Sequence, residues 1–326
     1  MSPAGRPGIV GLAAAALLLA LAGCATVPPP SGPVIAVRSA PVPLDLADPA
    51  HRAIGKFRYA GGFALTSDEP RLHGLSDLVL TPGDGILSVT DDGGDLLTAT
   101  LTLDADGAPA GLSDVRLTAQ SGLDGAPLKD KAWTDAEGLT RLRNGDRLVS
   151  FEREHRVWRY PAAGGPPVVA PMPPTVMAEN DGMEGLAAAP TVGADAYWVG
   201  VEPGDIWFCR LKSGCEAVTG LPVPPMGMRI SSLATGPGGE LVILHHVYIP
   251  GFGSRIQVSV IRDPRGAKTL IGRFELQTPL TIDNLEGIAV QKRPHGEWRL
   301  YLLSDDNFRA SQRTLLLAFD WTPPKR

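Results

Sequence analysis

Three glutamates in this sequence stand directly before a glycine and an apolar residue. The motifs are Glu137-Gly138-Leu139, Glu184-Gly185-Leu186 and Glu286-Gly287-Ile288. Other carboxylates follow short apolar segments, at Asp91, Asp92, Glu152, Glu202, Asp305 and Asp306. Carboxylates that share one site raise each other's pKa unless a cation compensates. Hard oxygen ligands suit Ca²⁺, or Mg²⁺ with retained waters, so these nine residues are candidate ligands of a divalent cation, with Ca²⁺ the expected ion.

Basic residues and histidines near these motifs could complete a hydrolytic site. A bound metal can activate a water for attack on a phosphoester, while cations neutralise the developing charge. The candidate catalytic residues are His73, Arg153, Arg229 and His245. Neighbouring residues of a strand point to opposite faces, so only one of His245 and His246 can face a site on a regular strand.

The same acidic residues could instead have a structural role. A carboxylate before a glycine can accept hydrogen bonds from a neighbouring repeat, and Asp-Asp-Gly-Gly at 91–94 can form a tight turn. A serine esterase is a poorer fit, because the sequence contains no Gly-x-Ser-x-Gly motif and Ser76 has no distinctive setting. The ligand role and the structural role both remain open at this point.

The elements that must position these residues are short strands. Apolar or alternating segments of about five residues are separated by Gly, Pro and Asp, which predicts an all-β domain. The apolar residues that open each repeat are 64, 47, 47 and 55 residues apart, at Leu75, Leu139, Leu186, Leu233 and Ile288. Repeats of this length are typical of four-stranded propeller blades.

Five blades are visible in the sequence, and six is the alternative. Residues 98–133 could hide part of another blade. The last repeat has only three strands before the C-terminus, so a strand near Phe57–Leu65 is predicted to complete it. Closure by strands from both ends of the chain would remove the open edge of the ring.

The N-terminal residues predict a lipoprotein. Residues 1–23 are typical of a signal peptide, and Cys24 follows small residues where lipidation would occur. Residues 24–50 are Pro-rich and are predicted to form an extended tether that buries little, leaving residues 51–326 for the propeller. Ala25 after the cysteine favours the outer membrane, facing the periplasm, with the membrane bound through the lipid.

Two further cysteines fit the same compartment. Cys209 and Cys215 are separated by turn residues, which predicts a disulfide across a hairpin. A two-ligand metal site is the poorer alternative, since no His or other Cys is near in sequence. The net charge of −5 argues against a nucleic-acid partner, which would need a basic face.

The repeated motifs together resemble the phytase-like β-propeller family, described as having esterase-like activity of phytase. The resemblance spans about residues 52–322, and its matching segments are 73–76, 89–93, 135–139, 150–152, 180–186, 283–288 and 303–307. It implies a propeller and hydrolysis of a phosphoester or ester. The fourth repeat departs from the pattern, with Ser231-Ser232-Leu233 and then His245-His246.

Two functions follow from these observations. The first is an envelope-anchored, metal-dependent hydrolase that acts on a small phosphorylated or ester substrate. The second is a non-catalytic propeller that binds a ligand or an envelope protein partner. Propellers host many activities, so the architecture alone does not choose between them.

Overall fold

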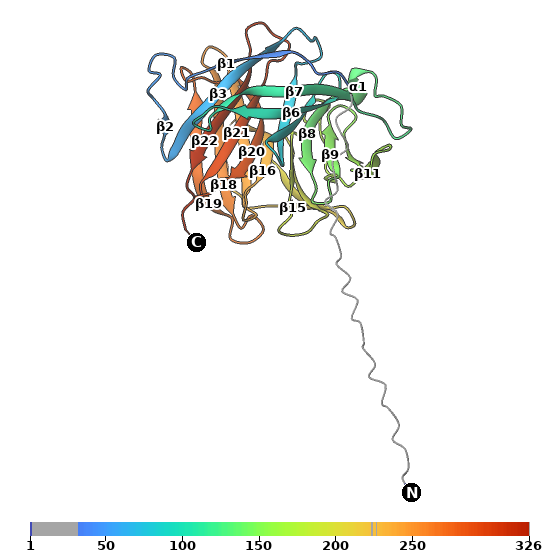
Figure 1. Cartoon of the computed structure of the whole chain (residues 1–326). Helices are drawn as coiled ribbons and strands as arrows, with labels where there is room; N and C mark the ends of the chain where they lie inside the picture. The colour runs from blue at the N-terminus through green and yellow to red at the C-terminus, as the bar shows by residue number, and fades with distance from the viewer. Residues whose placement is uncertain (2–31, 223, 226, 326) are drawn as a thin grey trace.

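The computed structural model describes residues 1, 32–222, 224–225 and 227–325, and these fold into a β-propeller of five blades (Figure 1). Four blades are antiparallel sheets of consecutive strands. Blade 1 contains β4 (Leu75–Thr81), β5 (Gly85–Thr90), β6 (Asp95–Leu103) and β7 (Pro109–Ala119). Blade 2 contains β8 (Ala136–Arg141), β9 (Arg147–Phe151), β10 (Arg156–Tyr160) and β11 (Val168–Ala170).

Blades 3 and 4 repeat this order, and blade 5 combines both ends of the chain. Blade 3 contains β12 (Gly185–Ala188), β13 (Ala196–Gly200), β14 (Ile206–Arg210) and β15 (Gly214–Val218). Blade 4 contains β16 (Arg229–Thr235), β17 (Leu241–Ile249), β18 (Gly253–Arg262) and β19 (Thr269–Gln277). Blade 5 contains β20 (Asn284–Lys292), β21 (Trp298–Asp305), β22 (Thr314–Trp321) and β3 (Phe57–Ser67), with β1 (Val37–Pro41) and β2 (Ala53–Ile54) paired to β3.

The predicted all-β class and the count of five blades are confirmed, whereas the alternative of six blades is wrong. Residues 98–133 form the rest of β6, β7 and a loop that ends in the short helix α1 (Lys131–Thr134). The predicted closure is also confirmed, because β3 pairs with β22, with Leu65 opposite Thr314. The last blade thereby gains a strand from the N-terminal part of the chain and the ring has no break.

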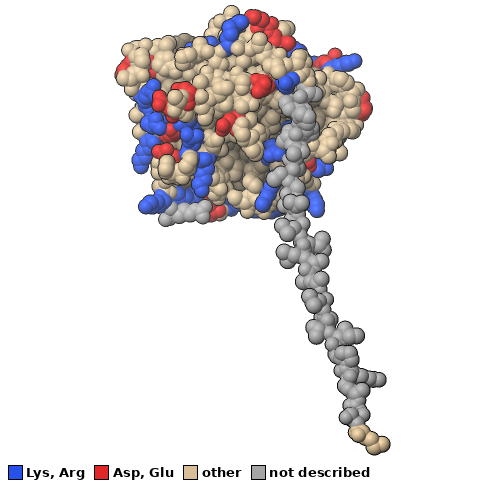
Figure 2. Space-filling view, in the orientation of Figure 1, with Lys and Arg blue, Asp and Glu red and all other residues tan. Residues whose placement is uncertain are grey.

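The strands form because their apolar side chains are buried between adjacent blades. All five residues of β13 are buried, and so are all eight of β22. A strand covered on both faces is largely apolar, whereas an outer strand such as β15 is largely accessible. Figure 2 shows basic and acidic side chains together on the outer face of the ring.

Part of the predicted tether packs on the propeller, which the sequence interpretation missed. β1 pairs with β3, with Val37 opposite Ser67. Ile35 is 8% exposed and Leu44 only 1% exposed. Proline is tolerated there because β1 is an edge strand, and the apolar residues between the prolines can still be buried. Cys24 and residues 2–23 lie outside the described part of the chain, and no helix in that described part is long and apolar enough to cross a membrane.

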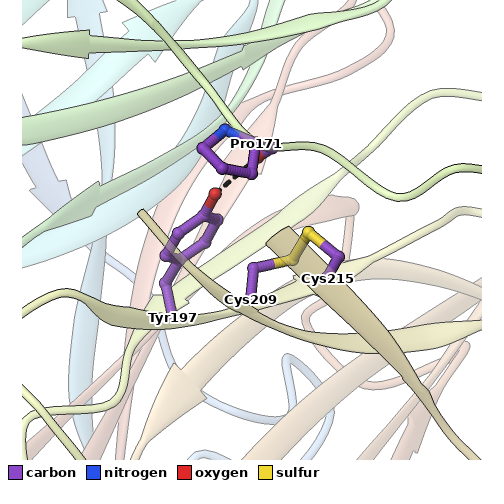
Figure 3. The surroundings of a disulfide bond; sticks show 4 residues. All are labelled: Pro171, Tyr197, Cys209 and Cys215. Atoms are coloured by element: carbon purple, nitrogen blue, oxygen red, sulfur yellow. Dashed lines mark hydrogen bonds between the residues drawn. A yellow bond between two sulfur atoms is a disulfide. The ribbon is translucent and has the colours of Figure 1, made fainter. Parts of the chain in front are cut away.

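The predicted disulfide joins Cys209 of β14 to Cys215 of β15 (Figure 3). The two residues lie opposite each other in the hairpin, with their Cα atoms 4.0 Å apart. Beside the bridge, the Tyr197 hydroxyl donates a hydrogen bond to the carbonyl of Pro171 and so links the sheet of blade 3 to the chain after blade 2. The hairpin prediction is therefore confirmed.

A β-bulge interrupts the innermost strand of four blades, and two of the acidic motifs occupy it. The irregular register falls between Ser76 and Val79, Ala136 and Leu139, Ile230 and Ser232, and Leu285 and Gly287. Asp77, Glu137, Ser231 and Glu286 are therefore the residues that lie at these bulges. A bulge redirects the side chain it contains, which explains why these four polar residues are turned away from the regular pleat.

Asp77 joins the blades at the centre of the ring. It is fully buried, with a left-handed φ of 55°. The Leu139 amide of blade 2 donates to its Oδ2 at 2.7 Å, and the Ser232 hydroxyl of blade 4 donates to its Oδ1 at 2.8 Å. A Cβ on Gly287 of blade 5 would lie 3.0 Å from the Asp77 carbonyl oxygen. One residue of blade 1 thus contacts three other blades.

We expect Asp77→Ala to lower the free energy of unfolding by roughly 3 kcal/mol, because buried donors at Leu139 and Ser232 would lose their acceptor. For a chain of this size that corresponds to a fall in Tm of several degrees, measurable by calorimetry. Asp106→Ala, at an exposed turn of blade 1, is the matched control and should leave the Tm unchanged. Equal Tm values for both variants would contradict a central role for Asp77.

Candidate functional site

The strand register brings the acidic residues to one end of the ring. The start of each innermost strand faces the end of the second strand, as in the pairs Leu75–Thr90, Ala136–Phe151, Gly185–Gly200, Ile230–His245 and Asn284–Asp305. The motifs that precede the first strand and follow the second therefore meet. We call this end the acidic mouth, formed by Asp91, Asp135, Glu137, Glu152, Glu184, Glu202, Glu286 and Asp305.

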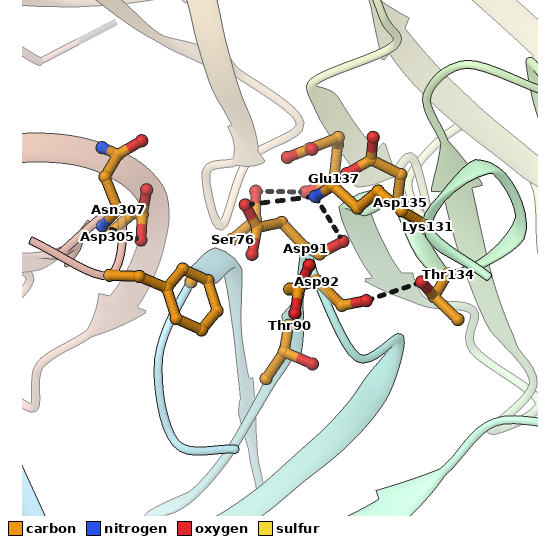
Figure 4. A network of polar contacts seen from close by, with 12 residues as sticks. Ser76, Thr90, Asp91, Asp92, Lys131, Thr134, Asp135, Glu137, Asp305 and Asn307 are labelled. Carbon is orange, nitrogen blue, oxygen red and sulfur yellow. Dashed lines mark hydrogen bonds and ion pairs between the residues drawn. The ribbon is translucent and has the colours of Figure 1, made fainter. Parts of the chain in front are cut away.

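The first cluster in the acidic mouth joins blades 1 and 2 (Figure 4). One carboxylate oxygen from each of Asp91, Asp135 and Glu137 lies within 4.8 Å of the others. Lys131 Nζ lies 2.5 Å from Asp135 Oδ1 and 3.6 Å from Asp91 Oδ2. Asp91 Oδ1 is buried and has no hydrogen-bond partner among the described residues. The cluster thus has one cation beside it and one carboxylate oxygen still to be satisfied.

The second cluster joins blades 2 and 3. One oxygen from each of Glu152, Glu184 and Glu202 lies within 4.8 Å of the others. Arg229 Nη2 lies 2.8 Å from Glu202 Oε2 and also pairs with Asp181. All three cluster members are residues that the sequence predicted as ligands, so the structure brings this predicted set together.

Two further carboxylates come from blade 5. The Asn284 side-chain amide donates to Glu286 Oε1 at 2.5 Å and to Asp305 Oδ2 at 3.4 Å. The charges of Asp305, Glu184 and Asp91 all act on Glu286. Blades 1, 2, 3 and 5 therefore contribute to the same acidic mouth, whereas blade 4 presents Ser231, whose hydroxyl donates to the Leu285 carbonyl.

Burial and mutual repulsion raise the pKa values across the mouth. Burial raises the pKa of Glu137, Glu184 and Glu286 well above the usual range, and neighbouring carboxylates raise each of them further. The main cause is again burial for four other members, with a pKa of about 6 for Asp91 and about 7 for Glu152, Glu202 and Asp305. Without further cations the mouth therefore holds protons at neutral pH.

Two predicted catalytic arginines lie at the rim in ion pairs. Arg153 Nε lies 2.6 Å from Asp135 Oδ2, and Arg229 contacts Glu202 as described. Both side chains are partly exposed, at 32% and 45%. They are therefore positioned to balance charge at the mouth.

Two other predicted ligands, Asp92 and Asp306, are not part of the acidic mouth. Asp92 is exposed, and its carbonyl accepts a hydrogen bond from Thr134 Oγ1 at 2.6 Å. Asp306 points away from its neighbour Asp305, and the His73 Nδ1 lies 2.7 Å from its Oδ2. Asp92 and Asp306 lie beyond the ends of β5 and β21, so the following turns orient them, which a count of acidic residues in the sequence cannot resolve.

His245 is buried away from the carboxylates of the mouth. It is 3% exposed, and burial lowers its pKa to about 4, with Arg273 lowering it further. Its strand partner is Gln257, also buried, and its Nδ1 has no hydrogen-bond partner among the described residues. The side chain lies between blades 3 and 4, where it lines a cavity with Pro203, Asp205 and Ile243.

The sequence interpretation missed three functional residues of the mouth. Asp135 stands two residues before Glu137, and its position in Asp135-Ala136-Glu137 was a usable signal because alternate residues share a face. Lys131 pairs with Asp135 four residues further on, and Asn284 donates to Asp305, its partner on the adjacent strand β21. No local pattern distinguishes this lysine from an ordinary exposed one.

The residues present fit a divalent cation. The donors are hard carboxylate oxygens from several strands, and Asp91 Oδ1 is buried without a partner. The two clusters are the groups of the described residues that could hold such an ion. The geometry of the two clusters is compatible with several hard cations.

Solved structures similar to this chain are propellers. A gluconolactonase from Xanthomonas campestris is 16% identical, with a TM-score of 0.46, covering 89% of this chain and 98% of its own. A virginiamycin B lyase from Staphylococcus aureus is 10% identical, with a TM-score of 0.41, covering 83% and 90%. No curated protein matches the chain.

The family comparison is specific. A family model described as phytase-like, with esterase-like activity of phytase, matches residues 70–308. The match contains every carboxylate of the acidic mouth and all five innermost strands. This chain belongs to the phytase-like β-propeller family.

Proposed function

We propose that the protein is a metal-dependent hydrolase of phosphoester or ester substrates. The observation that carries the proposal is the convergence of buried carboxylates from four blades on one mouth, with Asp91 Oδ1 left unpaired. A shared site with so many acidic groups is costly to ionise unless cations neutralise it. Family membership supports hydrolysis as the reaction class.

Ca²⁺ is the proposed ion, because it accepts six to eight oxygen ligands in flexible geometry. Asp91, Asp135 and Glu137 would hold one ion, and Glu152, Glu184 and Glu202 could hold another. A bound cation of this kind polarises a phosphoryl or carbonyl oxygen and lowers the pKa of a water ligand. Glu286 and Asp305 would complete the negative wall that faces it.

The chain's own residues can hold and transfer a proton beside this site. His73 Nδ1 is fixed by Asp306 at 2.7 Å, which orients the ring and leaves Nε2 on the other side for a substrate or water. His73 adjoins Gly74, where an added Cβ would lie 1.8 Å from Asp91 Oδ1. Arg153 and Arg229 would stabilise negative charge that develops at the rim.

A non-catalytic binding propeller is the second candidate. The observation in its favour is that Lys131, Arg153 and Arg229 already pair with carboxylates of the mouth. A mouth whose negative charge is partly neutralised in this way can bind a cationic ligand or an envelope partner without chemistry. Turnover separates the two candidates, since only the hydrolase predicts it.

We also propose that the propeller is anchored to the outer membrane through lipidated Cys24 and faces the periplasm. Support comes from the apolar N-terminal segment and from the Cys209–Cys215 bridge, which suits an oxidising compartment. The described chain begins to pack on the propeller at Ile35, so the tether would be short.

Removing the lipid attachment site tests the anchor. Cys24→Ser should move the protein from the membrane fraction to the soluble fraction of the envelope, because no acyl chain would remain. Cell fractionation with immunodetection measures this, with the conservative Ala25→Ser variant as control. Membrane retention of Cys24→Ser would argue against lipidation.

Glu184→Gln tests the catalytic proposal. It removes a ligand charge while preserving shape, so hydrolysis of a generic aryl phosphate or aryl ester with Ca²⁺ should fall at least about 100-fold, as expected when a transition-state interaction is lost. Glu154→Gln, at the exposed rim beside Arg153, is the control and should retain activity. No turnover by the unaltered protein on a broad panel with several divalent metals would favour the binding propeller.

The raised pKa values predict how pH affects stability and metal binding. Metal-free folded protein holds protons at Asp91, Glu152, Glu202 and Asp305 that the unfolded chain releases near its ordinary pKa values of 3.8 and 4.5. Stability should therefore fall as the pH rises from about 4 to about 8. Ca²⁺ replaces these protons, so its stabilisation should grow with pH and reach about 2.7 kcal/mol at 100 times its Kd.

Thermal unfolding between pH 5 and pH 8 measures this effect, with EDTA or with excess Ca²⁺. The double variant Glu152→Gln and Glu202→Gln should flatten both trends, since it removes two of the titrating groups. An identical effect of Ca²⁺ on the Tm at both pH values would count against metal binding at the mouth.

A further inference from the structure

A cavity of about 490 Å³ opens beside the acidic mouth, between blades 5 and 1. Its walls are the end of β3, the segment that leads into β4, and the loop between β21 and β22. Ligand pockets for small molecules commonly have volumes of about 300–1,000 Å³. The cavity is therefore large enough for a substrate group that is not itself reacting.

The wall between the cavity and the acidic mouth is thin. Asp305 points into the mouth and its neighbour Asp306 lines the cavity. A Cβ built on Gly74 would lie 1.8 Å from Asp91 Oδ1 and 3.0 Å from Phe308 Cε2. Gly74 thus lies between the candidate ligand Asp91 and the Phe308 ring at the cavity.

Phe308 is held at this boundary in an unfavourable backbone conformation. It is 49% exposed, with φ of 53°, and Asn307 before it has φ of 49°. The Asn307 amide donates to Asp305 Oδ1 at 2.7 Å, and the Phe308 amide donates to Asp306 Oδ1 at 3.2 Å. A left-handed bulky residue is strained, and such strain persists where the surroundings enforce it, commonly at ligand sites.

The rest of the cavity is apolar with a cationic end. Leu65, Leu72 and Ala64 provide apolar surface, and the Phe308 ring lies 5.3 Å from the His73 ring. Arg313 is paired with Asp283 at 3.4 Å, but Arg309 makes no ion pair with a described residue. Asp306, the carboxylate nearest to it in the lining, is engaged by His73 and Thr314.

We propose that this cavity is the subsite for the non-reacting part of the substrate, and that it selects an apolar ring or short chain that carries an anionic group. The ring packs on Phe308 and the anion pairs with Arg309, while the reacting bond lies toward Asp91. As a substrate subsite the inference rests on the proposed hydrolase function. Binding of the isolated group does not depend on that function, so the two can be tested apart.

Binding is measured first on the full chain in EDTA, by NMR of the ligand ring protons. The probes are benzoate and phenylphosphonate, which share a ring and differ in the anion, with benzyl alcohol and acetate lacking one feature each. Fragments of this size should bind with Kd on the order of millimolar. Benzoate or phenylphosphonate should bind at least about tenfold more tightly than either partial probe, as one lost charged contact implies.

Variants locate the binding. Arg309→Gln and Phe308→Ala should each weaken binding of the two anionic aryl probes by about tenfold or more. Arg143→Gln and Phe252→Ala, at exposed positions on other blades, are the matched controls and should bind normally. An unchanged Tm shows that a variant is folded. If Phe308→Ala does not fold, the comparison of Arg309→Gln with Arg143→Gln tests the proposal by itself. Equal binding by all four variants, or no preference for the anionic aryl probes, would overturn the proposal.

Kinetics with Ca²⁺ then separate the subsite from the reaction. For an aryl ester that carries a carboxylate, Arg309→Gln should raise KM about tenfold and leave kcat nearly unchanged, while an uncharged ester should be unaffected. Probe binding without any turnover would support the subsite and contradict the hydrolase. Turnover with the same KM in Arg309→Gln for both esters would support the hydrolase and contradict the subsite.

Discussion

The hydrogen bonds to Asp77 are the interaction on which the ring depends. A single buried carboxyl group accepts from Leu139 of blade 2 and Ser232 of blade 4, and its backbone abuts Gly287 of blade 5. Burial raises its pKa to about 8, so the group is largely neutral where most proteins work. Five innermost strands can approach this closely only because polar atoms at their centre satisfy each other.

The acidic mouth follows from the same convergence. Bulges beside Asp77 turn Glu137 and Glu286 out of the regular pleat, and the register places Asp91 and Asp305 beside them. The burial that raises the pKa values of these carboxyl groups also makes their ionisation costly. A nearby cation lowers this cost, and that cation can be Lys131, an arginine or a metal ion. The scaffold is rigid, since the site stands on strand ends locked within sheets, and this suits both proposed functions.

Much of this architecture was predictable because it depends on residue types that recur at regular spacing along the chain. Alternating apolar residues gave the strands, the repeat length gave five blades, and the spacing of Cys209 and Cys215 gave the hairpin disulfide. Orientation was harder to predict. Asp306 contacts His73 and belongs to neither carboxylate cluster, His245 is buried, and Ile35 and Leu44 pack on the propeller although prolines surround them.

The sequence by itself determined the all-β class, the closed ring and the carboxylates that gather at one end, because each follows from residue types at fixed spacing. Only the tertiary structure decided which carboxylates meet, since Asp135 and Lys131 join Asp91 through contacts between different blades. It also decided the cavity beside Phe308, where β3, β4 and the last blade come together. Contacts between segments more than 200 residues apart, such as His73 with Asp306, depend on closure of the ring and have no local signature.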